Sequence, residues 1–389
     1  RNAIVVANAD GTLSRFEIGG SGSGDLDGLS SLCAGNGTNA VCYGPGANAT
    51  GQNTTAIGAG ATAATACSTT DLGATAVGYN ATASAVNATA FGRDASASNA
   101  GSTALGSSAT ASGTNSQALG SSATASGDQS TALGRKAIAS GRTSQALGKE
   151  ANAIGNESTA LGVSANASGT GSQALGYQAT ASGTYSTALG FRAKANGNHA
   201  QASGSDAIAN GNYSQALGSG ANAQGEFSQA LGRSAKANGT GASALGYGAN
   251  ANNGDGTLAL GYLAKANGDG AQASGYGAKA CGTGAQALGY YAYAQGTGAQ
   301  ASGYSATANG IGARASGRSA NANGDGAQAL GYKANANGIC SLALGSDAKA
   351  SGSESTAVGT GAATTRDDQL MLGKAATEVT AANLANVDR

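Results

Sequence analysis

The chain has 389 residues, a formal net charge of zero, 67 glycines and no tryptophan. Charged residues make up 10% and aromatic residues 4%, so the sequence lacks the basic clusters of a nucleic-acid-binding protein and cannot build a thick core of large side chains. No apolar run approaches the roughly 20 residues of a membrane helix. A chain of this composition either stays disordered or buries small side chains in a thin, regular layer.

The first 43 residues differ in kind from the rest. Residues 1–18 contain two β-prone stretches separated by turn residues and predict a β-hairpin. Residues 19–43 are rich in glycine and serine and predict a flexible connector. Cys33 and Cys42 are close enough in sequence to form a disulfide in an oxidising compartment, and the total of five cysteines is odd. Because Arg1 is not an initiator methionine, we expect a segment of a longer protein.

A 14-residue unit, S-x-A-L-G-x-x-A-x-A-x-G-x-x, repeats through residues 44–373. The glycine that closes each ALG recurs every 14 residues from Gly92 to Gly246, and one inserted residue precedes the next member at Gly261. Each unit holds two short stretches with the period-two alternation of β-strands. Each stretch is followed by a glycine, where we expect a turn with positive φ. The unit therefore predicts one coil of a β-solenoid, stacked on the next at about 4.8 Å.

Alternation predicts that Ala118, Ala123 and Ala125 lie inside a coil and that Leu119 points outward. An exposed leucine stripe is an apolar patch that soluble monomers avoid, and parallel self-association would bury it with every coil in register. The pattern does not choose between two and three chains. The candidate interface leucines are Leu105, Leu119, Leu133, Leu147, Leu161, Leu175, Leu189, Leu217, Leu231 and Leu245.

Four units carry serine in place of this leucine, at Ser203, Ser274, Ser302 and Ser316. In a bundle of chains these coils would have a polar axis. The simplest interpretation is plain substitution, with the hydroxyl groups bonded to one another or to water. The alternatives are an ion held at the axis and a locally loosened bundle.

The repeat closely resembles the head repeat of trimeric autotransporter adhesins of the YadA type, over most of the chain and in more than twenty tandem copies. The resemblance implies an all-β, left-handed parallel β-roll, assembled as a parallel homotrimer around a leucine-lined axis. It also implies an extracellular, cell-surface fibre anchored in the outer membrane through parts outside this chain. Such heads also occur in phage and other tail fibres. Residues 374–389 weakly resemble the neck that follows these heads, whereas the five cysteines depart from the family, whose members carry few.

No catalytic or metal-binding pattern accompanies the repeat. His199, the one histidine, is interpreted as a surface residue at a turn, and the acidic residues form no repeating pair. Isolated Asp-Gly turns lack the tandem motif of calcium-binding rolls. Threonine alternates with glutamine before the ALG, which argues against a flat ice-binding array. We therefore predict that the chain is not an enzyme and has no cofactor or metal.

A tyrosine stripe, defined by the six tyrosines that directly follow the repeat glycine, is the most specific surface. Its members are Tyr247, Tyr262, Tyr276, Tyr290, Tyr304 and Tyr332, with Arg318 filling the gap. The stripe either reinforces stacking or contacts a glycan, a matrix protein or another cell-surface ligand. We predict an adhesive fibre head that makes head-to-tail contacts with further modules and has no nucleic-acid or membrane partner. The alternative is an architectural rod or tail-fibre spacer without its own ligand.

Overall fold

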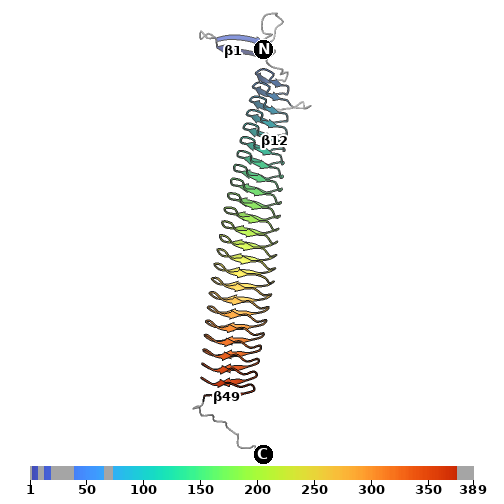
Figure 1. Ribbon diagram of the computed structural model, residues 1–389. Helices are drawn as coiled ribbons and strands as arrows, with labels where there is room; N and C mark the ends of the chain where they lie inside the picture. Colours follow the sequence, from blue (N-terminus) through green and yellow to red (C-terminus); the bar gives the residue numbers. More distant parts are fainter. Residues whose placement is uncertain (1, 8–12, 19–38, 65–72, 375–389) are drawn as a thin grey trace, which may run out of the picture. The chain divides into compact units, whose positions relative to one another are not determined.

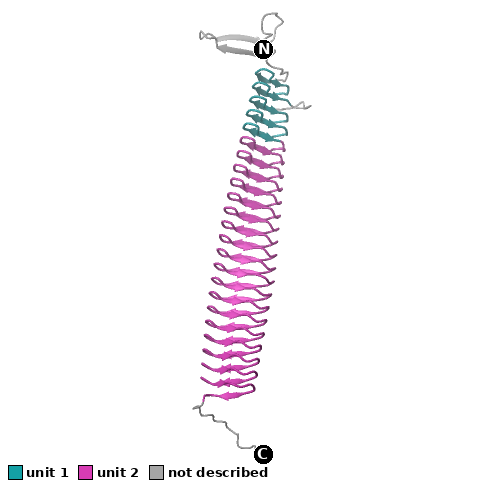
Figure 2. Cartoon of the chain, viewed as in Figure 1, with its two compact units in different colours: residues 1–111 teal, residues 112–389 magenta. Residues whose placement is uncertain are grey.

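A computed structural model of the chain describes residues 2–7, 13–18, 39–64 and 73–374 (Figure 1). These residues form strands and turns, and no helix in this part of the chain is long and apolar enough to cross a membrane. The chain divides into two compact units, residues 1–111 and 112–389 (Figure 2).

The first unit contains an antiparallel strand pair and two parallel ladders. The antiparallel pair is β1 (Asn2–Ala7) and β2 (Leu13–Ile18). One ladder consists of three-residue strands, β3 (Val41–Tyr43), β5 (Thr55–Ile57), β7 (Thr75–Val77), β9 (Thr89–Phe91) and β11 (Thr103–Leu105). The other consists of two-residue strands, β4 (Asn48–Ala49), β6 (Thr62–Ala63), β8 (Thr82–Ala83), β10 (Ser96–Ala97) and β12 (Thr110–Ala111).

The second unit repeats the same two ladders over many more coils. Its three-residue strands run from β13 (Gln117–Leu119) to β49 (Leu370–Leu372), and each begins 14 residues after the last except at one inserted residue. Its two-residue strands run in the same way from β14 (Thr124–Ala125) to β48 (Ala363–Thr364). The inserted residue lengthens one step in each ladder, from β31 (Ser243–Leu245) to β33 (Leu258–Leu260) and from β32 (Asn250–Ala251) to β34 (Lys265–Ala266).

Strands in each ladder pair in parallel and in perfect sequence register. Gln117 pairs with Thr131, Ala118 with Ala132 and Leu119 with Leu133. Every repeat position therefore stacks on the same position of the next coil. The all-β parallel solenoid of 14-residue coils predicted from the repeat is confirmed.

The interior of each coil is as thin as the composition requires. Every buried apolar side chain among the described residues is an alanine, and the largest fully buried side chains are threonines and serines. Ala118, Ala123 and Ala125 have no exposed surface, whereas Leu119 is on the outside. Methyl groups are enough to fill a coil whose two strands are this short.

The two corner glycines serve different purposes. Gly120, which closes the ALG, has a φ of 138°, as predicted. The prediction of positive φ at the second corner glycine is wrong for Gly127, because the left-handed residue of that turn is Gln129, with a φ of 56°. Gly127 is required instead by close approach, since a Cβ atom there would lie 2.0 Å from the carbonyl oxygen of Gly141.

Candidate functional site

The tyrosine stripe forms a stack of parallel rings along the turn that follows the three-residue strands. Ring centroids lie 5.1 Å apart for Tyr247 and Tyr262, and 4.8 Å apart for Tyr262 and Tyr276. The stack continues at 5.0 Å to Tyr290 and at 4.9 Å to Tyr304. Each of these tyrosines is between 41% and 50% exposed. The coil spacing therefore places these rings at stacking distance.

Arginines extend the stripe at both ends of this ring stack. The Arg233 guanidinium carbon lies 5.7 Å from the centroid of Tyr247. Arg318 lies between Tyr304 and Tyr332, at 5.5 Å and 5.9 Å from their centroids, and so fills the gap that the sequence shows there. Each exposed cation–π contact of this kind contributes about 0.5–1 kcal/mol. The stack of tyrosine rings therefore has a positively charged arginine at each end.

The stacking decides which part of each tyrosine a ligand can reach. Each inner ring covers the face of the next, so the free surface consists of ring edges and hydroxyl groups. Tyr291 adds an edge-on ring against both Tyr276 and Tyr290, with interplanar angles of 79° and 89°. Its hydrogen bond to Tyr276, then its Coulombic effect and a little desolvation, raise the pKa of Tyr276 above its ordinary value. The stripe offers hydrogen-bonding groups rather than open aromatic faces.

A second aromatic ladder, which the sequence analysis did not identify, consists of Tyr185, His199, Tyr213 and Phe227. Successive centroids are 5.4, 4.9 and 5.2 Å apart. All four residues have φ values between 53° and 57°, at the turn before the three-residue strands. His199 is exposed, as predicted, and is sandwiched between two tyrosines. The signal in the sequence is aromatic recurrence at 14-residue intervals in a position that glycine or a polar residue holds elsewhere.

Within each unit, the candidate interface leucines lie on the outward side of the three-residue strands, which we call the leucine face. Leu133, Leu161 and Leu189 are between 45% and 49% exposed. Leu105 and Leu217 are also exposed, and Leu119, Leu147, Leu175, Leu231 and Leu245 are half-buried. Where Ser203 replaces leucine, a hollow of about 340 Å³ opens between Leu189 and Leu217.

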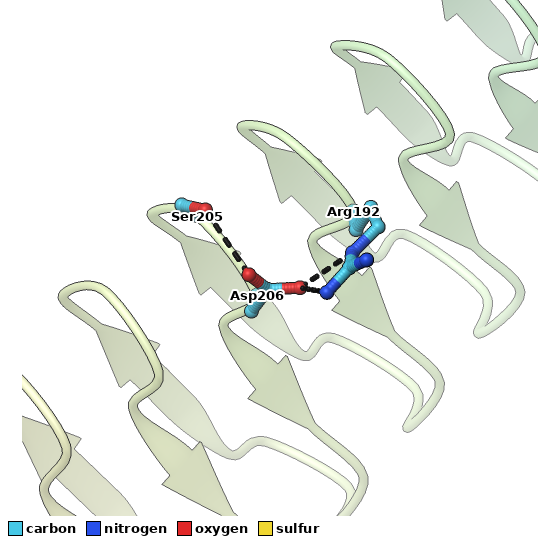
Figure 3. Close-up of polar contacts among 3 residues, drawn as sticks. All are labelled: Arg192, Ser205 and Asp206. Atoms are coloured by element: carbon cyan, nitrogen blue, oxygen red, sulfur yellow. Dashed lines mark hydrogen bonds and ion pairs between the residues drawn. The ribbon is translucent and has the colours of Figure 1, made fainter.

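A shallow groove on the surface of the two-residue strands contains the closest ion pair of the described residues. Two guanidinium nitrogens of Arg192, Nε and Nη2, lie 2.7 Å and 2.6 Å from Oδ1 of Asp206 (Figure 3). Ser205 donates a hydrogen bond of 3.2 Å to Oδ2 of the same carboxylate. The adjoining hollow of about 390 Å³ is lined by Gln178, Arg192, Lys194, Asp206 and Ile208. The pair is exposed and links adjacent coils, which is worth about 0.5 kcal/mol.

The cysteines and acidic residues form no metal site in the described chain. Among the described residues, no three His, Cys, Asp or Glu side chains are grouped to hold an ion. Cys42 is disulfide-bonded. Cys33, its predicted partner, lies outside the described residues, so this pairing stays a prediction. Cys281 and Cys340 are free thiols.

Comparison with known proteins identifies the repeat. A model of the YadA head domain repeat, in its two-copy form, matches more than half of the chain, at residues 36–65, 72–95, 97–123, 111–137, 139–165, 153–172, 167–193, 209–235, 223–249, 253–278, 287–313 and 336–362. No curated protein matches. Among solved structures, the collagen-binding domain of the Yersinia adhesin YadA is similar at 19% identity, over 58% of this chain and 78% of that chain, with a TM-score of 0.15. By its repeats, the chain belongs to the YadA head family.

Proposed function

We propose that the chain is the non-catalytic head of an extracellular adhesive fibre, which attaches a cell to a host, a surface or another cell. Family membership supports the fibre, because the matched repeats are head repeats of an adhesin family. The regular stack supplies a scaffold with the same cross-section from coil to coil. Such a scaffold holds surface groups at fixed spacing and needs no catalytic centre.

Three copies assemble in parallel through the leucine face in this proposal. That face repeats an apolar side chain about every 4.8 Å without an internal partner, and burial of a leucine gains about 1.5–3 kcal/mol. The in-register ladders mean that a contact made at one coil is repeated at the next. A closed trimer satisfies every copy of such a face equally.

The tyrosine stripe is the proposed contact surface, and its regular stack of half-exposed rings is the observation that carries the proposal. Ring edges and hydroxyl groups face solvent, with Arg233 and Arg318 within reach. This chemistry suits a glycan or matrix protein that offers carbonyl, hydroxyl or carboxylate acceptors. Three stripes on one trimer would strengthen weak contacts through effective concentration.

Adhesion of beads coated with the protein to immobilised matrix proteins, collagen included, and to a glycan array tests this function. The triple variant Tyr247→Phe, Tyr276→Phe, Tyr290→Phe keeps the stack but removes three hydroxyl groups per chain. We expect adhesion to fall several-fold while the oligomeric state stays unchanged and the melting temperature falls only slightly, through loss of the hydrogen bond between Tyr276 and Tyr291. The matched control, Tyr185→Phe with Tyr213→Phe in the second ladder, should adhere normally.

The alternative function is an architectural rod, and one observation favours it: the stacked rings already cover one another's faces. The variant Tyr247→Ser, Tyr276→Ser, Tyr290→Ser separates the two functions. A lower melting temperature together with unchanged adhesion would assign the stripe to stacking alone. Unchanged adhesion in both triple variants would overturn the proposed contact surface.

A further inference from the structure

The outer surface of the three-residue strands carries a single charged residue. In these strands, from β3 to β49, the first position is held by threonine, glutamine, serine, valine or leucine, except in β41 (Arg314–Ser316). The third position is apolar or serine, except for Tyr43 in β3. Arg314 is therefore the one charge on this side of the described strands, and no Asp or Glu shares it.

Arg314 stands where the leucine face is most polar. Ser302 and Ser316 are paired in adjacent strands, which is the one place where two consecutive coils carry serine instead of leucine. Gln300 and Gln328 pair with Arg314 on either side. Arg314 and Ser316 are two positions apart in β41, so their Cα atoms are about 6.6 Å apart. An arginine side chain can span this distance.

Serine in this position leaves room on the face. Ser203 shows the effect, with its hollow of about 340 Å³ between two leucines. Its neighbour Ala202 is also slightly exposed, as are Ala301 and Ala315 beside the two adjacent serines. Because Ser302 and Ser316 lack the leucine side chain, the alanines beneath them are less well covered in two consecutive coils.

The charge of Arg314 has no counter-charge nearby among the residues that the structure describes. Its side chain is exposed and forms no ion pair among the described residues. In a parallel, in-register assembly Arg314 would meet the Arg314 of each neighbouring copy, and the described three-residue strands hold no acidic residue to pair with it. Burial of three like charges without a counter-ion is strongly unfavourable.

We propose that Arg314, Ser302 and Ser316 of three copies form an internal anion site, which rests on the trimer of the proposed function. The guanidinium groups supply charge and paired N–H donors, and the serine hydroxyls supply further donors. The ligand is a small inorganic anion such as sulfate, phosphate or a halide. One chain has only a third of the donors, so the site is incomplete without the partner copies.

A single charged layer also fixes the alignment of the chains. The leucine layers repeat every coil, so an assembly displaced by one coil would still bury most of its leucines. Displacement would place Arg314 against Gln300 or Gln328 of another copy and break the anion site. The site therefore selects the aligned trimer, as a buried polar residue selects the register of a coiled coil.

Thermal unfolding of the full chain in different salts tests the site. At constant ionic strength, replacement of gluconate by sulfate should raise the melting temperature by several degrees, because an anion that binds the assembled form stabilises it. Arg314→Gln, which restores the usual residue of this position, should reduce the difference to the general stabilising effect of sulfate. The control Arg318→Gln removes a positive charge from the tyrosine stripe instead. This variant should keep the full difference in melting temperature between sulfate and gluconate. An equal salt response in both variants would overturn the proposal.

Crystals soaked in bromide locate the anion directly. Anomalous density on the three-fold axis between Ser302 and Ser316 is expected in the unchanged protein, and its absence there would refute the site. The double variant Ser302→Leu, Ser316→Leu should fill the space and exclude bromide. Light scattering in gluconate tests the assembly separately. A monomer would refute the trimer of the proposed function. A trimer that shows no salt response and binds no bromide would refute the anion site alone.

Discussion

The carbonyl oxygen of Gly141 occupies the space where a side chain on Gly127 would begin. An ideal Cβ atom on Gly127 would lie 2.0 Å from that oxygen, and the same atom on Gly141 would lie 2.0 Å from the carbonyl oxygen of Gly155. Ladder hydrogen bonds such as that from Ser126 N to Ala139 O, at 2.9 Å, set this separation between coils. The close approach therefore leaves no room for a side chain on Gly127 or Gly141.

Replacement of Gly141 by alanine should therefore destabilise the stack. The added methyl group must push adjacent coils apart, and overpacking of this kind costs up to about 3 kcal/mol. Chemical unfolding followed by circular dichroism measures the loss. Hydrogen exchange should be fastest at the amides of the coils on both sides of residue 141.

The matched control is Gly284→Ala. Gly284 has a φ of 64°, and a Cβ atom there would meet nothing within 4 Å. Only the left-handed conformation is penalised, at about 1 kcal/mol. Equal losses in the two variants would contradict the close-approach explanation.

The sequence predicts the coil well because its alternation and its 14-residue period fit one arrangement, a stack of coils with two short strands each. Alternation places Ala118 inside and Leu119 outside, and the 14-residue period then fixes the parallel register of every strand. The role of Gly127 could not be predicted, because it depends on the distance between coils and not on the local backbone. The tyrosine stripe was found from recurrence alone, but the covering of its ring faces follows only from the geometry. The second ladder was missed because Tyr185 and Phe227 occupy a turn position that is usually polar or glycine.

Charge on the leucine face should dissociate the assembly. Leu133→Asp with Leu147→Asp places carboxylates at two adjacent, partly exposed positions that are paired in the ladder. In a trimer this buries six like charges near one axis, so we expect monomers or unfolded chains by light scattering. The control, Thr180→Asp with Asn166→Asp on the two-residue strands, should remain assembled. Trimers in both variants would refute the leucine interface.

Asparagine ladders should contribute measurably to coil stacking. Asn323 accepts a hydrogen bond from Asn309 and donates one to Asn337, both at 2.7 Å. Asn323→Ala should lower the free energy of unfolding by about 1–2 kcal/mol through the loss of both bonds. Asn335→Thr is the comparison, because Oδ1 of Asn335 is buried without a hydrogen-bond partner in the described chain. That variant should be neutral or stabilising, and a loss equal to that of Asn323→Ala would contradict the ladder argument.

Alkaline pH should weaken the region around Tyr276. The hydrogen bond with Tyr291, followed by its Coulombic effect, raises the pKa of Tyr276 above the ordinary value of 10.0. The folded state therefore holds the phenol proton more tightly than the unfolded state. Its contribution to stability is complete below about pH 10 and is lost as the pH rises through the raised pKa.

The pKa shift itself can be followed by NMR titration of the Cζ resonance of Tyr276 in protein labelled with ¹³C-tyrosine. Tyr291→Phe keeps the edge-on ring but removes the hydroxyl group, so the pKa of Tyr276 should return toward its ordinary value. Tyr332→Phe removes a hydroxyl group from a distant coil of the same stripe and should leave the raised pKa in place. A pKa of Tyr276 that stays raised in Tyr291→Phe would show that the hydroxyl group of Tyr291 is not its cause.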